Sequence, residues 1–155
     1  KKIGLIDFCK DVGVIPFISN PLDINGLASG RYTAGDPSGG DFTRPNGPFG
    51  LRQLEELRPL HTMQDKVAER VQKRVKKEQR DRKDSRGRQS QDEQKDIGGI
   101  TTTQIAINYV VAKGGVPIVD VTDLSTAEEV VGCLGWALTE EEVDMLDRAA
   151  TLASM

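Results

Sequence analysis

The chain has 155 residues, a formal net charge of −3 and a 37% share of hydrophobic residues. This length suits one domain with one core, and the apolar share lies at the low end for globular proteins. No apolar run is long enough to cross a bilayer, which excludes a protein built on transmembrane helices. Cys9 and Cys133 lie far apart in sequence, so free thiols in a reducing compartment are favoured over a disulfide or a metal site.

The first residues predict a helix followed by a strand. Ile3, Ile6 and Cys9 fall at helical spacing, and Gly13 supplies the turn at which such a helix ends. The run from Val14 to Ser19 is apolar and β-branched, and Asn20-Pro21 closes it. An αβ unit is therefore expected before residue 21.

A loop and a long helical region follow. Gly and Pro recur so densely over residues 36–50 that a surface loop is expected there. Apolar residues then return to helical spacing over Leu51–Val75, with Pro59 expected to break or kink the run, so one helix or two are expected. His61 is interpreted as a surface or packing residue, because no acid or base lies at a telling spacing from it.

Residues 76–96 form a charged insertion without any aliphatic or aromatic side chain. Such a segment cannot offset the entropy of ordering by burial, so either a helix projecting into solvent or disorder is expected. Eleven basic residues face four acidic ones over Lys66–Arg88. A basic run of this kind can bind nucleic acid or an acidic partner, but no Phe or Tyr is present to stack on bases, which favours a solvated insertion.

Three helices and one strand are predicted over Thr101–Val143. Each helix start carries a hydroxyl with Glu or Gln three residues later, which is typical of a capping box; the pairs are Thr101 with Gln104, Ser125 with Glu128, and Thr139 with Glu142. Between the first two lies the short β-branched run Gly115–Val119, which predicts one buried strand. Together these elements indicate an αβα unit of a parallel α/β fold.

Collinear motifs over most of the chain resemble one known family. They are Pro21-Leu22, Gly26-Leu27, Gly30-Arg31-Tyr32, Thr101–Asn108, Val116-Pro117-Ile118, Ala127-Glu128-Glu129, Gly132, Leu134-Gly135-Trp136 and Leu138–Val143. These segments resemble the C-terminal part of an aldo/keto reductase, most closely the plastid-type reductases of plants and algae. The match leaves out residues 36–48 and the charged insertion.

The resemblance implies a (β/α)₈ TIM barrel that binds NADPH. Residues 1–155 would form a partial domain holding about the last third of the barrel, with the loops after its seventh and eighth strands, where phosphate sites of such barrels gather. The family's catalytic Tyr, Lys, Asp and His lie on earlier strands, and no residue of this chain aligns with them. Tyr32 and Tyr109 fall at other positions, so this chain alone is predicted to be inactive, and no metal is implied.

The resemblance also implies which residues would contact the cofactor. They are Asn20, Pro21, Leu22, Gly26, Leu27 and Arg31 in the first loop, and Thr122, Thr126 and Glu129 in the second. The first loop carries one extra residue within Asp23–Asn25. In the second loop only Glu129 is retained, and Thr122 stands where the family has Lys or Arg for the adenosine phosphate. Asp120 and Asp123 would also bring like charge to that phosphate, so NADPH binding is expected to be weakened or lost, while NADH binding stays open.

Two strands alone cannot close a barrel, because the sheet edges stay unpaired and the apolar helix faces lack cover. A missing N-terminal part or a protein partner is therefore expected to cover them, and a first residue other than Met favours the missing part. Localisation cannot be read from this N-terminus; the resemblance implies a soluble protein of the chloroplast stroma.

Three hypotheses follow. The first is a reductase-like, non-catalytic structural or accessory subunit of a larger assembly. The second is the C-terminal portion of an active NADPH-dependent carbonyl reductase. Nucleic-acid binding through Lys66–Arg88 is a distant third. Substrate, partner identity and oligomeric state are not encoded in any motif that we can interpret.

Overall fold

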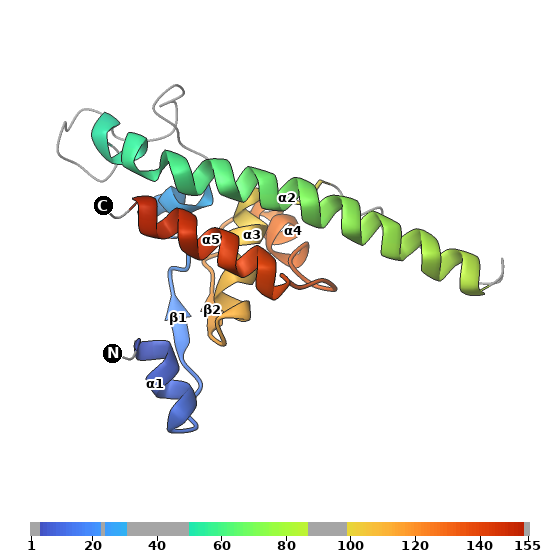
Figure 1. Ribbon diagram of the computed structural model, residues 1–155, viewed down its shortest axis with the longest axis horizontal. Helices are drawn as coiled ribbons and strands as arrows, with labels where there is room; N and C mark the ends of the chain where they lie inside the picture. The colour runs from blue at the N-terminus through green and yellow to red at the C-terminus, as the bar shows by residue number, and fades with distance from the viewer. Residues whose placement is uncertain (1–3, 23, 31–49, 87–98, 154–155) are drawn as a thin grey trace.

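The computed structural model describes residues 4–22, 24–30, 50–86 and 99–153. In chain order the elements are α1 (Leu5–Asp11), β1 (Phe17–Ser19), the 3₁₀ helix η1 (Ile24–Ser29), α2 (Leu51–Arg86), α3 (Thr102–Ala112), β2 (Val116–Ile118), α4 (Leu124–Val131) and α5 (Glu140–Ala153). The long helix α2 crosses the top of the molecule, α5 lies along it, and the two strands and α1 extend from the opposite side (Figure 1). Most of the expected 36–50 loop and residues 87–96 of the charged insertion lie outside the described residues.

The two strands are parallel neighbours, as expected for part of a (β/α)₈ barrel. Phe17 pairs with Val116, and Ser19 pairs with Ile118, so both strands end at the same edge. The helix α3 leads into β2 through Gly114 and Gly115, and a Cβ on Gly115 would lie 2.8 Å from Cγ1 of Ile18. This close approach leaves no room for a side chain between the two segments. The coarser prediction, parallel strands joined through helices, is therefore confirmed.

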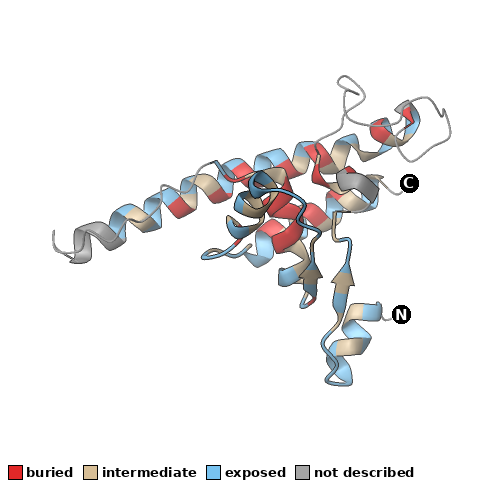
Figure 2. Cartoon of the chain, turned by 180° about the vertical axis from the view of Figure 1, so that it is seen from behind, coloured by how far each residue is buried: buried red, intermediate tan, exposed pale blue. Residues whose placement is uncertain are grey.

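The strand predicted within Gly115–Val119 is confirmed as β2, but the prediction that it is buried is wrong. The relative exposures of Val116 and Ile118 are 40% and 49%, and that of Phe17 in the neighbouring strand is 67%. The exposed surface continues over α1 and the strands (Figure 2). A β-branched run predicts burial only where other elements cover both faces of the sheet, and within the described residues this sheet has two strands.

The core lies between α2, α3 and α5 rather than against the sheet. Its buried members are Val67, Ala68, Val71, Val75, Ile100, Ile105 and Leu146, with Met63, Tyr109, Trp136, Leu138 and Met145 packed around them. The buried positions of α2 recur at spacings of three and four residues, which places them on one face of the helix. In Figure 2 this buried face of α2 turns toward the other helices.

Of the two alternatives for this region, one helix is confirmed and a break at Pro59 is wrong, because α2 runs continuously from Leu51 to Arg86. Both sides of the proline are anchored: Leu54 is 1% exposed, and His61 is 6% exposed. Proline removes one hydrogen bond from a helix, and tertiary packing on either side can hold such a helix together. The charged insertion is helical as far as Arg86. This last part of α2 extends past α5 and α3 into solvent (Figure 1).

Helix η1 is attached to α2 by two polar side chains. Nε2 of His61 lies 3.1 Å from the carbonyl oxygen of Leu27, and Nε2 of Gln64 donates to the carbonyl of Ala28 at 2.7 Å. Burial lowers the pKa of His61 below its usual value, although the hydrogen bond to Leu27 and the nearby Asp65 oppose the change. His61 is therefore a packing residue, as predicted, and it holds the loop after β1 in place as a neutral donor.

A buried ion pair joins α2 to α5. Glu142 is 1% exposed, and its Oε2 accepts hydrogen bonds from Nη2 of Arg74 at 3.0 Å and from the backbone N–H of Thr139 at 2.8 Å. Arg74 also donates to the carbonyl of Ala137 at 2.8 Å, and Arg70 forms an ion pair with Glu141. Two cations of the basic run thus form ion pairs with acidic residues of α5, which weakens the nucleic-acid hypothesis.

Two of the three expected capping boxes are confirmed. Thr101 caps α3 with reciprocal hydrogen bonds to Gln104, and Thr139 exchanges the same pair of bonds with Glu142. The third prediction is wrong: α4 begins at Leu124, and its N-cap is Asp123 rather than Ser125. A carboxylate at an N-cap accepts from backbone N–H groups as a hydroxyl does, so the helix starts two residues earlier than the hydroxyl pattern suggests.

Replacing Glu142 by Ala is expected to lower the free energy of unfolding by about 3 kcal/mol. The substitution removes the cap of α5 and the buried carboxylate that accepts from Arg74, which keeps only its longer ion pair with the more exposed Glu78, at 3.7 Å. Urea unfolding followed by circular dichroism measures the change. The control is Asp144→Ala, which removes an exposed acid from the same helix; an equal loss in both variants would contradict the role assigned to Glu142.

Stability is expected to fall as the pH drops from about 7.5 to about 5.5. His61 is the single histidine of the chain, and its folded pKa is lowered, so the unfolded chain takes up a proton near its ordinary pKa of about 6.5 before the folded chain does. The stabilisation is thus complete above this range and is lost as the pH falls through it. His61→Gln should flatten the dependence of urea midpoint on pH, and an unchanged slope would refute the assignment.

Candidate functional site

The loops after β1 and β2 meet at one edge because the strands are parallel. Asn20 follows β1 directly with a φ of 53°, a left-handed conformation that Asn tolerates better than most residues. The chain then turns back, and the N–H of Ala28 donates to the carbonyl of Leu22 at 2.9 Å. Pro21 and Leu22, which follow β1 in this loop, are half-buried at the edge of the sheet.

Three of the six residues expected to contact a cofactor in the first loop lie at this strand edge. Leu27 is 6% exposed, and its carbonyl is held by His61, so its side chain serves packing. Gly26 belongs to η1 by its backbone. Arg31 lies outside the described residues. The structure therefore brings Asn20, Pro21 and Leu22 to the strand edge, while Leu27 is turned into the core.

The second loop ends at Asp123, whose carboxylate caps α4. Its Oδ1 accepts from the backbone N–H of Thr126 at 2.8 Å, and its Oδ2 accepts from the hydroxyls of Thr126 at 2.9 Å and of Thr122 at 3.1 Å. Helix N-termini bind anions through such free N–H groups. Here the chain's own carboxylate occupies that position.

The hydrogen bonds at α4 keep this carboxylate charged. The N–H of Thr126, its hydroxyl and the hydroxyl of Thr122 lower the pKa of Asp123 below its usual value. The hydroxyls of Thr122 and Thr126, both expected to contact a cofactor, therefore donate their hydrogen bonds to Asp123. A second anion at this helix start would meet a fixed negative charge and donors that are already used.

Glu129, which lies in α4 and was expected to contact a cofactor, also has internal partners. Its Oε1 accepts from the hydroxyl of Thr101 at 2.9 Å, and its backbone carbonyl accepts from Nε2 of Gln104 at 2.9 Å. These bonds join α4 to the start of α3. The residues that the NADPH hypothesis assigns to the adenosine end do not fit a 2′-phosphate, since their polar groups are engaged with one another and the local charge is negative.

A second polar cluster brings together Tyr109, Lys113 and Asp147 between α3 and α5. The hydroxyl of Tyr109 donates to Oδ1 of Asp147, and Nζ of Lys113 lies 2.7 Å from Oδ2 of the same carboxylate. Burial, then the hydrogen bond to Asp147, raises the pKa of Tyr109 well above its usual value. Although burial opposes it, the bonds from Lys113 and Tyr109 hold the pKa of Asp147 below its usual range.

This cluster has the residue types of an acid–base site but the wrong electrostatics. A tyrosine that gives up a proton near neutral pH needs a lowered pKa, whereas the carboxylate beside Tyr109 stabilises its protonated form. The cluster ties α3 to α5, and Lys113 packs with its ammonium 5.5 Å from the centre of the Tyr109 ring. We therefore assign it a structural role.

The described residues contain no group of three His, Cys, Asp or Glu side chains arranged to hold a metal ion. Cys9 and Cys133 are both free. Burial, together with Glu129, raises the pKa of Cys133 to about 11, so its thiol stays protonated and unreactive near neutral pH. Within the same part of the chain, no helix has the length and apolar character required to cross a membrane.

Sequence reasoning missed the roles of Asp123 and Asp147. The signal for Asp123 was present, because an Asp three residues before Thr126 fits an N-cap as well as Ser125 does. Asp147 gave no signal, since its partners Tyr109 and Lys113 lie 38 and 34 residues away. Such contacts depend on how α3 packs against α5.

Comparison with known proteins gives one family and one relative. The sequence matches the aldo/keto reductase family over residues 1–151. It is similar to the chloroplastic pyridoxal reductase of Arabidopsis thaliana, with 25% identity over 150 residues that cover 97% of this chain and 32% of that protein. The chain thus spans about a third of the length of this curated relative. No solved structure matches it.

Tyr109 is expected to ionise far above the ordinary tyrosine pKa of about 10. The variant Tyr32→Phe leaves Tyr109 as the single tyrosine of the chain. Its ultraviolet absorbance at alkaline pH, recorded with circular dichroism to confirm that the chain stays folded, reports the tyrosinate. A midpoint at or below the ordinary value in the folded protein would show that Tyr109 is poised as an acid, against the structural role.

Proposed function

The chain belongs to the aldo/keto reductase family, and from this membership we propose that it acts as a non-catalytic structural or accessory subunit of a larger assembly. The observation that carries the proposal is the self-capped start of α4, where Asp123 accepts from the N–H of Thr126. The family resemblance would place the adenosine phosphate at this helix start. Oxidoreductases of this family generally use NADP(H). NADPH remains possible by family resemblance, but its affinity is weakened or lost in this proposal.

The candidate acid–base groups support the same proposal. Tyr109 is held protonated by Asp147, and His61 is buried against Leu27 as a neutral packing residue. Neither side chain is placed to give a proton to a carbonyl substrate. Tyr109 is the single tyrosine among the described residues, and its hydroxyl donates to Asp147 between α3 and α5.

The exposed sheet supports an assembly. Phe17, Ile18 and Val116 lie in a two-stranded sheet whose outer edges carry unpaired backbone groups within the described residues. Exposed apolar side chains continue onto α1, where Leu5 is 77% exposed and Phe8 is 55% exposed. Contiguous apolar surface of this kind marks an interaction site, and further parallel strands are the cover that fits both the edges and the faces.

The alternative is that the chain is the C-terminal portion of an active NADPH-dependent carbonyl reductase. It is favoured by the family match over residues 1–151 and by the fraction of the relative that the chain spans. In that case the catalytic Tyr, Lys, Asp and His would come from other strands of the barrel. A plastid location is proposed from the same relative.

The two proposals differ in their response to NADPH. We expect titration with NADPH, followed by nicotinamide fluorescence and by the melting temperature, to give no saturable signal in the low micromolar range. Saturable binding in that range would overturn the accessory-subunit proposal and favour the reductase. Any binding that does occur should be sensitive to salt, because it would depend on charge.

A double variant tests whether α4 is the cause. Thr122→Lys with Asp123→Ser replaces the carboxylate cap by a hydroxyl cap and adds a cation at the position where the family has Lys or Arg. We expect this variant to bind NADPH more tightly than the parent chain. Asp144→Lys, which makes the same change in net charge on α5, is the matched control, and an equal gain there would rule out a specific role of α4.

A further inference from the structure

The outward faces of α2 and α5 carry two rows of charged residues with the same spacing. Successive members of a row are four residues apart, so each row runs along one side of its helix with a charge about every 6 Å. All six residues are exposed. They are Glu69, Lys73 and Lys77 on α2, and Glu140, Asp144 and Arg148 on α5.

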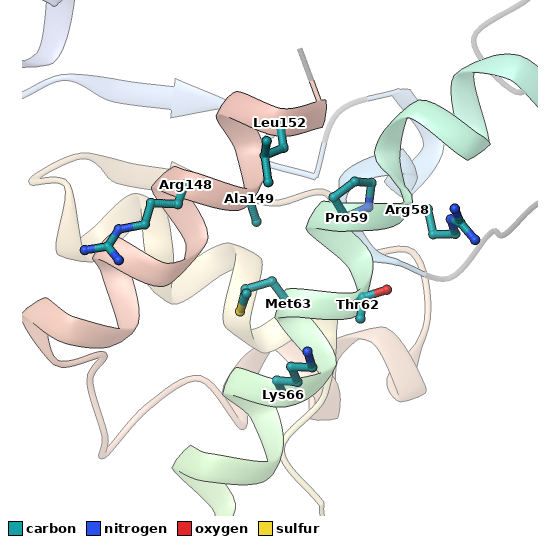
Figure 3. Close-up of a pocket in the computed structure, with 8 residues that line it drawn as sticks. All are labelled: Arg58, Pro59, Thr62, Met63, Lys66, Arg148, Ala149 and Leu152. Atoms are coloured by element: carbon teal, nitrogen blue, oxygen red, sulfur yellow. The ribbon is translucent and has the colours of Figure 1, made fainter. Parts of the chain in front are cut away.

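Both rows face away from the three-helix core. On α2 the buried Val71 and Val75 lie two residues from members of the row, which is about half a helical turn. On α5 the buried Glu142 and Leu146 have the same offset from its row. Figure 3 shows the side chain of Arg148 pointing away from α2. Each row therefore faces solvent on its own side of the molecule.

The charges of the two rows are not used within the part of the chain that the structure describes. The ion pairs between α2 and α5 are formed by Arg70 and Arg74 with Glu141 and Glu142 instead. Among the described residues, no ion pair involves a member of either row. Both rows are thus available to a partner.

The signs of the two rows are complementary in one orientation only. From the start of α2 toward its end the row reads acid, base, base, and from the end of α5 toward its start it reads base, acid, acid. Antiparallel helices therefore place opposite charges together at every step, whereas parallel helices would pair two acids at one end and two cations at the other. The antiparallel pairs are Glu69 with Arg148, Lys73 with Asp144, and Lys77 with Glu140.

We propose that α2 of one chain binds α5 of a second copy, with the two helices antiparallel and the two rows in contact. The complementary signs select the chain itself as the partner, because both halves of the contact are present on it. The contact joins two different faces, so it leaves a free row at each end and continues to a third copy. It involves neither the strand edge nor the start of α4, so it does not depend on whether the chain binds NADPH.

A nucleic acid fits these faces less well than a second copy does. It would use the lysines of α2 alone, would meet the carboxylate of Glu69 in the same row, and would leave the row on α5 without a role. Self-association uses the charges of both signs.

Sedimentation velocity measures the association on the intact chain. In about 20 mM salt the weight-average mass should rise with protein concentration beyond that of two chains, and in about 0.5 M salt the chain should stay monomeric, because salt screens exposed charges. The association is expected to be weak, since each exposed ion pair contributes little. A chain that stays monomeric at low salt, whether or not it retains a DNA duplex, would overturn the proposal.

Charge reversal identifies the faces in contact. Lys73→Glu with Lys77→Glu, and Glu140→Lys with Asp144→Lys, should each weaken the association by roughly tenfold or more, because like charges then face each other. An equimolar mixture of the two double variants should associate again, since every step then places opposite charges together. Circular dichroism confirms that both variants keep the fold of the parent chain.

The matched control is Asp7→Lys with Asp11→Lys. It reverses two exposed acids four residues apart on α1 and makes the same change in net charge as the α5 variant. It should associate as the parent chain does. The proposal is overturned if this control loses association like the α5 variant, if the reversed variants keep it, or if their mixture stays monomeric.

Discussion

The ion pair between Glu142 and Arg74 is the interaction on which the described body depends. It joins Arg74, inside α2, to Glu142 in the first turn of α5, 68 residues later in the sequence. Glu142 also accepts from the N–H of Thr139 at the start of α5, so the pair holds α5 along α2. Once α5 is held there, Leu146 reaches the core beside Val71, and Asp147 meets the groups on α3. The packed core is therefore a three-helix arrangement, and the sheet is attached to it through α3 and η1.

This distribution of packing explains what the sequence could and could not predict. Helix starts that depend on residues three apart, such as Thr101 with Gln104, were correctly predicted because the interaction is local. The continuity of α2 through Pro59 and the exposure of Val116 depend on what covers each segment, which no local pattern contains. The same limit applies to Asp147, whose partners come from another helix.

The strand edge shows the same division between framework and chemistry. The family resemblance correctly identified the chain, and the parallel strands, the turn at Asn20 and the helix after β2 are all present. The polar groups at that edge, however, bind one another: Asp123 takes the donors of α4, and Glu129 takes the hydroxyl of Thr101. These bonds use the groups that a phosphate would need, and this is the reason for our proposal that the chain has a structural role.

The most direct test of this account is an amide NMR titration of the start of α4 with adenosine 2′,5′-bisphosphate, the part of NADPH that carries the 2′-phosphate. The account predicts that the N–H signals of Ser125 and Thr126 stay unchanged, because the carboxylate of Asp123 already occupies the N–H of Thr126 and repels a second anion. Saturable shifts of these two signals would contradict it, since they would show that the helix start still binds the phosphate that the family recognises.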